Sequence, residues 1–217
     1  MTYTVKEIFY TLQGEGAQTG RAAVFCRFSG CNLWTGREED RSRAVCQFCD
    51  TDFVGIGPDG GKFKTATELA DAITRCWEGK ASPMQTDMGT KKYVVCTGGE
   101  PLLQVDEALI DALHERGFEV AVETNGTRPA PASLDWICVS PKAGAPLVQT
   151  SGSELKLVYP QEKAPPEDFE HLAFRHFFLQ PMDSADTQLN TERAIDYCLR
   201  HPRWRLSIQT HKLVGLR

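Results

Sequence analysis

Three cysteines in a polar segment constrain this chain more than any other feature. Cys31, Cys46 and Cys49 follow the spacing C-x14-C-x2-C, directly after an apolar run over residues 22–28 that predicts a strand. Their neighbours are Gly, Asn, Gln and Asp, which are not typical of a buried core. Three thiolates hold three irons of a four-iron cluster, and the fourth iron then has no protein ligand. Such an iron can bind a small molecule and take part in its chemistry.

The other five cysteines do not need a metal. They lie in apolar or helix-like segments, where a buried thiol behaves as a small hydrophobic residue. The N-terminus has no basic end followed by an apolar run, and no apolar stretch approaches the ~18 residues of a membrane span. We therefore expect a cytoplasmic protein with reduced thiols and no membrane contact. The net charge of −5 argues against a nucleic-acid partner. These five cysteines are Cys26, Cys76, Cys96, Cys138 and Cys198.

The pattern of apolar runs predicts an α/β fold. The early order of strand, helix, strand, helix, strand favours parallel pairing. Residues 1–217 fit one domain, which is too short for a complete eight-fold barrel of about 250 residues. We therefore expect a partial, open (β/α) barrel of about six parallel strands with fewer helices than strands. The expected strands are 22–28, 93–96, 119–123, 136–139, 154–158, 175–179 and 205–209, and the expected helices are 67–78, 104–116 and 191–200, with N-caps at Thr67 and Thr191 and stops at Gly79 and Gly117.

The segment between the first two clustered cysteines, residues 32–45, is expected to be an enlarged cluster-binding loop. Six of the seven residues in 37–43 are charged, so this segment is a solvated excursion and not part of the core.

Small and polar residues follow nearly every expected strand. In parallel α/β folds, ligands bind at the carboxyl ends of the strands. The sequence therefore predicts a site assembled from many loops. These loops begin Ser29-Gly30-Cys31, Thr97-Gly98-Gly99-Glu100, Thr124-Asn125-Gly126, Ser140-Pro141-Lys142, Gln180-Pro181-Met182 and Thr210-His211-Lys212.

Taken together, these residues resemble a known superfamily. The three cysteines, the aromatic Phe48 before the last of them and the Gly-Gly-Glu-Pro sequence at 98–101 are similar to those of the radical S-adenosylmethionine enzymes. The usual spacing there is C-x3-C-x2-C, and the longer first gap resembles that of some members of the 7-carboxy-7-deazaguanine synthase family. The resemblance covers essentially the whole chain, because Leu12-Gln13-Gly14-Glu15-Gly16, Cys49-Asp50-Thr51 and Gln209-Thr210-His211-Lys212 also match that family.

The resemblance implies a [4Fe-4S] cluster on the three cysteines, with S-adenosylmethionine chelated by the open iron and cleaved after a one-electron reduction. Gly99 would offer its carbonyl to the cofactor's ammonium group, because no side chain blocks the approach. Glu100 would position that loop, and Lys142 would pair with the methionine carboxylate. The implied cofactor-binding residues are Phe48, Cys49, Asp50, Gly99, Glu100, Glu123, Asn125, Ser140, Pro141, Lys142 and Gln180.

The resemblance also implies the substrate, 6-carboxy-5,6,7,8-tetrahydropterin. Hydrogen abstraction, ring contraction and loss of ammonia would give 7-carboxy-7-deazaguanine, an early step of queuosine-type 7-deazapurine biosynthesis. Arg27 is expected to bind the substrate carboxylate through two parallel hydrogen bonds. The expected substrate-binding residues are Leu12, Gln13, Gly14, Glu15, Arg27, Thr97, His211 and Arg217.

The family further implies magnesium, an external electron donor such as a flavodoxin, and a homodimer. Thr51 is the position that matches the family's magnesium ligand. Asp50 and Asp52 are its charged neighbours, and a hard cation prefers oxygen ligands.

Other readings of these residues remain open. The cysteines can instead hold a structural zinc in a binding module without catalysis, although no fourth Cys or His stands nearby in the sequence. A glycyl-radical activating enzyme would share the cofactor chemistry but act on a protein. Glu123 and Lys142 can form an ordinary buried ion pair, and Arg27 can be a surface charge on an edge strand.

Overall fold

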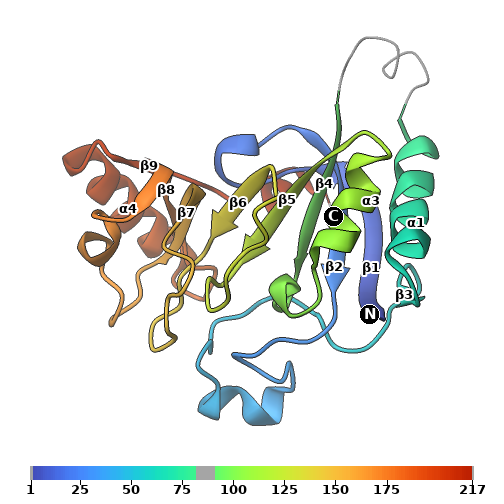
Figure 1. The fold of residues 1–217 in the computed structure, drawn as a ribbon. Helices are drawn as coiled ribbons and strands as arrows, with labels where there is room; N and C mark the ends of the chain where they lie inside the picture. Colours follow the sequence, from blue (N-terminus) through green and yellow to red (C-terminus); the bar gives the residue numbers. More distant parts are fainter. Residues whose placement is uncertain (1, 82–90, 217) are drawn as a thin grey trace.

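The computed structural model describes residues 2–81 and 91–216, and within them nine strands form one sheet. Seven consecutive strands of the sheet, from β2 to β9, pair in parallel. β1 and β3 extend one edge in antiparallel pairing (Figure 1). In order across the sheet the strands are β3 (Gly61–Phe63), β1 (Tyr3–Leu12), β2 (Ala22–Phe28), β4 (Lys92–Gly98), β5 (Phe118–Thr124), β6 (Trp136–Val139), β7 (Ser151–Tyr159), β8 (Ala173–Pro181) and β9 (Trp204–Leu206).

Within the described residues, helices are fewer than strands, as predicted. The N-cap of α1 is Thr65, whose hydroxyl accepts a hydrogen bond from the Glu68 N–H over 3.1 Å, and Gly79 ends the helix. The N-cap of α3 is Asp106, which accepts from the Leu109 N–H over 3.0 Å. The α-helices are α1 (Ala66–Glu78), α3 (Glu107–His114), α4 (Thr187–Arg200) and α5 (Thr210–Val214), and the 3₁₀ helices are η1 (Gly16–Gln18), η2 (Glu38–Arg43), η3 (Pro101–Leu103) and η4 (Pro166–Phe169).

The predicted α/β architecture is confirmed, and the differences lie at its edges. All seven predicted strands are present and parallel to one another. The predicted N-caps Thr67 and Thr191 were wrong, because α1 begins at Ala66 and α4 at Thr187. The last predicted strand, 205–209, is limited to Trp204–Leu206, and the chain then turns into α5. β1, β3 and α5 were not predicted.

The main core lies between the sheet and the helices on one of its faces. Alternate residues of the central strands are fully buried against α1 and α3, as the period of two in a strand requires. Figure 1 shows α1 and α3 covering β1, β2 and β4, and a second apolar cluster joins α4 to β7 and β8. The strand residues of the main core are Tyr3 and Val5 on β1, Val24, Cys26 and Phe28 on β2, Val94 and Cys96 on β4, and Phe118, Val120 and Val122 on β5.

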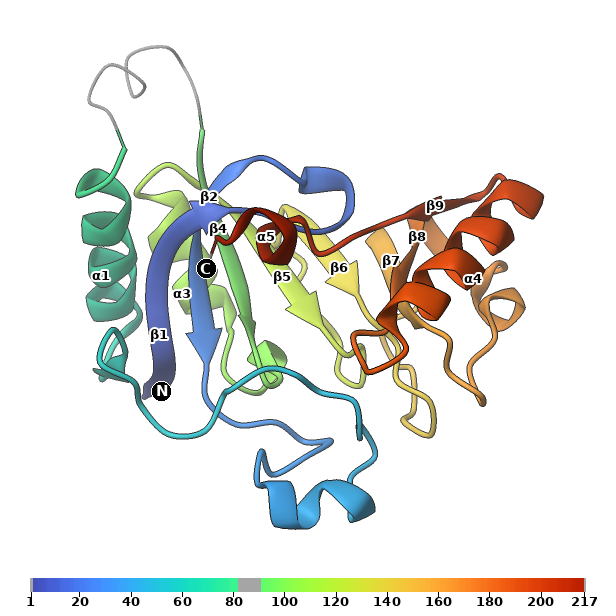
Figure 2. The same ribbon diagram turned by 180° about the vertical axis from the view of Figure 1, so that it is seen from behind.

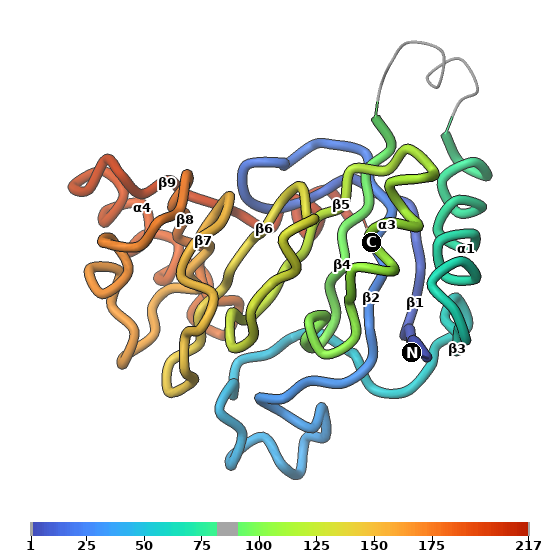
Figure 3. The backbone as a smooth tube through the Cα atoms, viewed as in Figure 1, coloured from blue at the N-terminus to red at the C-terminus, as the bar shows by residue number. Residues whose placement is uncertain are grey.

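The opposite face of the sheet carries the polar side chains. Seen from behind, α5 lies on this face, whereas α3 lies on the other (Figure 2). The loop between β1 and β2 crosses the same face, because Ala17 N–H donates to the Glu154 carboxylate of β7 over 2.8 Å. A long excursion between β2 and β3 runs past the carboxyl ends of the parallel strands (Figure 3). The sheet, this excursion and the C-terminal segment together surround one cavity.

Within the described ranges, no helix has both the length and the apolar character needed to cross a bilayer.

Candidate active site

A cavity of about 410 Å³ lies on the polar face of the sheet. Its walls come from β1, β2 and the strands from β4 to β8, from residues 46–52 and from the segment that contains α5. Most of the predicted site residues line it together, although they come from distant parts of the chain. These residues are Leu12, Gln13, Gly14, Glu15, Arg27, Cys46, Phe48, Cys49, Asp50, Thr51, Thr97, Gly99, Glu123, Asn125, Ser140, Lys142, Gln180 and His211.

Three predicted residues within the described ranges do not line this cavity. Cys31 and Glu100 lie directly behind its wall, and Pro141 lines a smaller neighbouring pocket of about 90 Å³. Arg217 lies outside the described residues.

Two of the three clustered cysteines, Cys46 and Cys49, line the cavity, and Cys31 lies near them behind its wall. The Cys31 sulfur accepts a hydrogen bond from the Leu33 N–H over 3.4 Å. A hydrogen bond from the Cys46 thiol is the main cause that lowers the pKa of Cys49 to about 6, and the same bond raises the pKa of Cys46. Burial raises the pKa of Cys31. Cys49 is therefore poised as a thiolate, the form in which cysteine binds metal.

The Gly-Gly-Glu-Pro loop packs directly against the cysteine loop. A side chain at Gly99 would lie 2.2 Å from the Gly30 carbonyl oxygen, and Gly98 has a φ of +146°. The Glu100 N–H donates to the Gly30 carbonyl over 2.9 Å. Only glycine allows this close approach of the two backbones, which leaves the Gly99 backbone open to the cavity.

Glu100 holds the loops that follow two neighbouring strands. Its side chain is fully buried, and its two oxygens accept from the Leu102 N–H over 2.9 Å, the Thr124 hydroxyl over 2.8 Å and the Asn125 N–H over 2.8 Å. These bonds join the loop after β4 to the loop after β5. This arrangement agrees with the predicted positioning role of Glu100.

Lys142 places a positive charge beside the cysteines. Its ammonium donates to the Ser140 carbonyl over 2.8 Å and to the Ser140 hydroxyl over 2.6 Å, and it lies 5.9 Å from the centre of the Phe48 ring. Burial lowers its pKa. Among the described residues, no carboxylate forms an ion pair with it, and an ammonium has a third N–H to donate. The suggested Glu123–Lys142 ion pair was therefore wrong.

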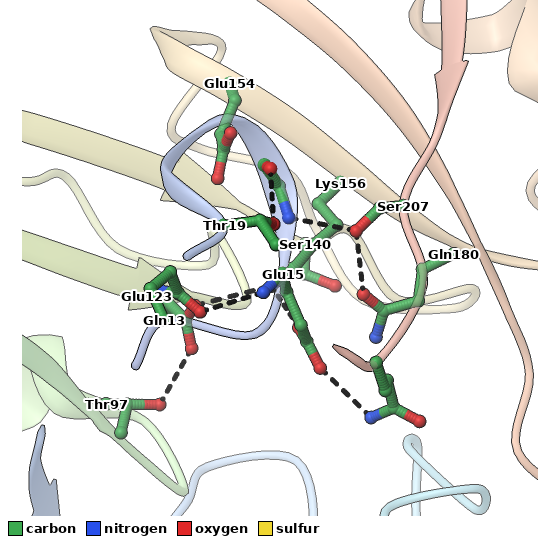
Figure 4. A network of polar contacts seen from close by, with 12 residues as sticks. Gln13, Glu15, Thr19, Thr97, Glu123, Ser140, Glu154, Lys156, Gln180 and Ser207 are labelled. Carbon is green, nitrogen blue, oxygen red and sulfur yellow. Dashed lines mark hydrogen bonds and ion pairs between the residues drawn. The ribbon is translucent and has the colours of Figure 1, made fainter. Parts of the chain in front are cut away.

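Glu123 pairs instead with Lys156, a residue that the sequence did not single out. The Lys156 ammonium lies 3.4 Å from Glu123 Oε1 and also forms an ion pair with Glu15 (Figure 4). Gln13 Nε2 donates to Glu123 over 3.1 Å, and Thr97 donates to it over 3.2 Å. All five members of this network, Gln13, Glu15, Thr97, Glu123 and Lys156, line the cavity.

The network fixes the charge of its members. Burial opposes ionisation of Glu15, but the Lys156 ammonium and hydrogen bonds from Lys156 and Gln209 outweigh it and hold the pKa of Glu15 at about 2. Burial also opposes the charge of Lys156, and Glu123 and Glu15 reverse this effect and raise its pKa. One cation between two carboxylates is thus maintained inside the cavity wall.

Arg27 and His211 complete the wall. Arg27 Nε donates to Glu7 over 2.8 Å, so the side chain is paired and only a fifth exposed, and it lies beside the stacked rings of Phe9 and Phe25. The reading of Arg27 as a surface charge was wrong, because the side chain lines the cavity. The His211 ring lies against Gly14, where an added Cβ would be 2.2 Å from Nδ1.

The acidic neighbours of Thr51 are both engaged by lysines. Asp50 pairs with Lys212 over 2.6 Å, and Asp52 pairs with Lys6 over 2.8 Å. Lys212 also pairs with Asp183, so it joins α5 to Asp50, directly after Cys49, and to the loop after β8. Thr51 lines the cavity between them.

Several other cavity residues were missed by sequence reasoning. The alternation Glu154, Lys156, Val158 on β7 was a readable signal of a strand with one polar face, whereas the alternation of β1 is broken at Lys6 and Glu7. Gly98, Thr124, Pro181, Met182, Asp183, Gln209 and Lys212 belong to the loops and motifs that the sequence indicated, but no individual role was expected for them. The residues that the sequence did not indicate are Glu7, Phe9, Thr11, Phe25, Cys138, Lys156 and Val158.

No group of three His, Cys, Asp or Glu side chains in residues 2–81 and 91–216 converges on a point that would hold one metal ion. A four-iron cluster places each thiolate on a different iron, so its cysteines need not converge in this way.

Known proteins resemble this chain over its full length. No protein-family model matches it. A 7-carboxy-7-deazaguanine synthase from Caulobacter vibrioides is 65% identical over 217 residues, and one from Bradyrhizobium diazoefficiens is 65% identical over 218 residues, each covering 100% of both chains. A crystal structure of QueE from Escherichia coli superposes with a TM-score of 0.70 at 27% identity, covering 97% of this chain and 95% of that one. The chain therefore belongs to the 7-carboxy-7-deazaguanine synthase family of enzymes.

Proposed function

We propose that this chain, as a single radical S-adenosylmethionine domain over residues 1–217, converts 6-carboxy-5,6,7,8-tetrahydropterin into 7-carboxy-7-deazaguanine with loss of ammonia. One observation carries the proposal: a single cavity is lined by Cys46 and Cys49, with Cys31 directly behind its wall, and by the charged hydrogen-bonding network of Glu15, Lys156 and Glu123. Because the chain belongs to this enzyme family, we do not propose a zinc-stabilised binding module or a glycyl-radical activating enzyme.

The residues present fit a [4Fe-4S] cluster and S-adenosylmethionine. Cys31, Cys46 and Cys49 would hold the cluster, and the lowered pKa of Cys49 favours the thiolate that it requires. Gly99 packs so closely on the cysteine loop that any side chain there would collide with Gly30 and Cys31, and its backbone lines the cavity beside the cysteines. When bound, the two groups supply the one-electron chemistry that removes a hydrogen atom from the substrate.

The cavity wall offers partners for each part of the cofactor. The Gly99 carbonyl would accept from its ammonium group. The Lys142 ammonium donates two of its N–H groups to the carbonyl and the hydroxyl of Ser140. Its third N–H would donate to the carboxylate of S-adenosylmethionine. The adenosyl group would lie along the part of the wall formed by Phe48, Asp50, Glu123, Asn125 and Gln180.

The part of the cavity wall formed by residues 12–15 and Thr97 would suit a pterin. Its edge needs neighbouring donors and acceptors, which the backbone and side chains of residues 12–15 and Thr97 supply. Arg27 would bind the substrate carboxylate through the guanidinium N–H groups that do not contact Glu7. His211 and Arg217 would cover the far side. The Lys156 ammonium lowers the pKa of Glu15, which would keep that carboxylate available as an acceptor.

Magnesium would bind at Thr51. Because Asp50 and Asp52 are already paired with lysines, the Thr51 hydroxyl is the oxygen that remains for the ion, with waters and the substrate carboxylate as its other ligands. The enzyme would act in the cytoplasm as a homodimer and receive electrons from an external donor such as a flavodoxin.

Anaerobic turnover tests the proposal. Protein reconstituted with iron and sulfide is incubated with S-adenosylmethionine, magnesium, dithionite and the tetrahydropterin, and products are measured by mass spectrometry and an ammonia assay. We expect 7-carboxy-7-deazaguanine and ammonia in equal amounts. Cys49→Ala is the control and should form neither. A protein that carries its cluster but leaves the pterin unchanged would refute the proposed reaction.

A further inference from the structure

One side chain of the excursion 32–45, that of Arg41, contacts the turn 46–49 that carries two of the cysteines. Arg41 lies in η2, and its Nη1 donates to the carbonyl of Gln47 over 2.8 Å and to the carbonyl of Cys49 over 3.0 Å. Both carbonyls belong to the turn 46–49, which carries two of the three cysteines. Residues 46–52 lie outside any helix or strand, so side chains such as this one determine their conformation.

The guanidinium of Arg41 is itself held on two further sides. Its Nε donates to both oxygens of Glu38 over 2.7 and 2.8 Å, and its Cζ lies 4.1 Å from the centre of the Trp34 ring. Trp34 is buried, donates its indole N–H to the Arg37 carbonyl over 3.1 Å and packs edge-on against buried Phe53. The side chain is therefore fixed by stacking, by an ion pair and by two backbone acceptors.

Its neighbour Arg43 has none of these contacts with the turn. It is 79% exposed and pairs only with Asp40 among the described residues, whereas Arg41 is 29% exposed. The two arginines share a 3₁₀ helix and a charge, and they differ in whether they reach the cysteines. This difference provides a matched control.

We propose that Arg41 is a positioning residue for the cluster: it fixes the turn 46–49 in the conformation that receives the cluster, so the excursion 32–45 is a working part of the cluster site. The inference rests on the proposed function, because it assumes that the three cysteines hold the cluster. Residues that orient metal ligands typically contribute about 10- to 100-fold to metal affinity.

Cluster retention tests the inference without measuring turnover. Wild type, Arg41→Gln, Arg41→Lys and Arg43→Gln are reconstituted anaerobically and challenged with a chelator, and the iron and sulfide retained per chain are measured over time. We expect Arg41→Gln to lose its cluster about tenfold faster or more. Arg43→Gln should match the wild type. Arg41→Lys should recover less than half of the difference, because an ammonium neither forms a planar fork nor stacks in the same way.

Two further measurements separate positioning from unfolding. Circular dichroism and thermal unfolding of the cluster-free proteins should be alike for Arg41→Gln and Arg43→Gln, and the electron paramagnetic resonance signal of the reduced cluster should change in Arg41→Gln alone. If Arg41→Gln does not fold, Glu38→Ala decides, because Glu38 is 77% exposed and only orients Arg41; we then expect retention below that of the wild type.

Three outcomes would overturn the inference: equal retention in Arg41→Gln and Arg43→Gln, full recovery by Arg41→Lys, or, where Glu38→Ala decides, retention equal to that of the wild type. A wild-type protein that takes up no cluster would instead refute the proposed function, so the two failures are distinguishable.

Discussion

A Cβ atom on Gly99 would lie 2.7 Å from the Cβ atom of Cys31. The loop after β4 and the loop after β2 therefore touch at a point where only a glycine fits, although 68 residues separate them in the sequence, from 31 to 99. This contact joins the cysteine loop to the backbone that would accept the cofactor's ammonium group.

Gly99→Ala should separate these two loops. The added methyl group would collide with the Gly30 carbonyl at 2.2 Å, and overpacking of this kind typically costs about 1–3 kcal/mol of unfolding free energy. We also expect weaker S-adenosylmethionine binding by the reconstituted protein, measured by equilibrium dialysis. Gly79→Ala, at the end of α1, is the control and should bind normally. Normal S-adenosylmethionine binding by Gly99→Ala would contradict the idea that the close packing of Gly99 on the cysteine loop shapes the cofactor site.

Lys156→Met should be strongly destabilising. The substitution keeps most of the side-chain volume but leaves Glu15 and Glu123 facing each other without their cation. Breaking a buried ion pair from one side typically costs about 3–5 kcal/mol. Urea unfolding at pH 7 measures the loss. The double variant Lys156→Met, Glu15→Gln should recover part of it, and strictly additive effects would show that the two groups do not interact.

The same network predicts how stability depends on pH. The pKa of Glu15 falls from its ordinary value of 4.5 to about 2 on folding. Its contribution to stability is therefore fully present above pH 4.5 and is lost as the pH falls towards 2. Urea unfolding between pH 2 and 6 should show a steeper loss of stability for the wild type than for Glu15→Gln. Parallel curves would mean that Glu15 is not held ionised.

Lys212→Gln should weaken ligand binding more than it weakens the fold. The Lys212 ammonium joins α5 to Asp50 and Asp183 at the cavity, but it is 40% exposed, and such pairs contribute at most ~1 kcal/mol to stability. We expect little change in melting temperature and a roughly fivefold higher Kd for S-adenosylmethionine, since a factor of ten corresponds to about 1.4 kcal/mol. Lys62→Gln, on the edge strand β3, is the control. An unchanged Kd would remove the proposed link.

Arg27→Ala should raise the KM for the pterin more than it lowers kcat. The guanidinium contacts Glu7 and lines the cavity, so its loss removes a partner for the substrate carboxylate but leaves the cysteines untouched. Arg27→Lys keeps the charge and should recover only part of the binding, since a paired hydrogen bond needs the guanidinium. Loss of cofactor binding in Arg27→Ala would assign Arg27 a different role.

The central sheet could be predicted because its strands are continuous apolar runs. Runs such as 93–96 and 120–122 are buried on both faces, as expected for parallel strands. β1 escaped prediction because Lys6 and Glu7 interrupt its alternation, and one irregularity in its pairing lies at the same place, between Val5 and Glu7. β3 and α5 are three and five residues long, too short to show a period.

The candidate site was predictable where a motif named it. The three cysteines, the Gly-Gly-Glu-Pro loop and Lys142 stand in recognisable sequence patterns. Lys156 does not, because a single lysine in an apolar strand has no motif, and its partners Glu15 and Glu123 lie 141 and 33 residues away. The pairing of Arg41 with the cysteine turn also depends on the path of the excursion, which its charge pattern does not define.

The proposed reaction requires one iron of the cluster that no protein side chain coordinates. Mössbauer spectroscopy of anaerobic protein reconstituted with ⁵⁷Fe measures this directly. We predict one iron in four whose signal changes when S-adenosylmethionine is added, and no such iron in Cys49→Ala. Four irons that do not respond to the cofactor, or a wild-type protein that binds no iron, would contradict it.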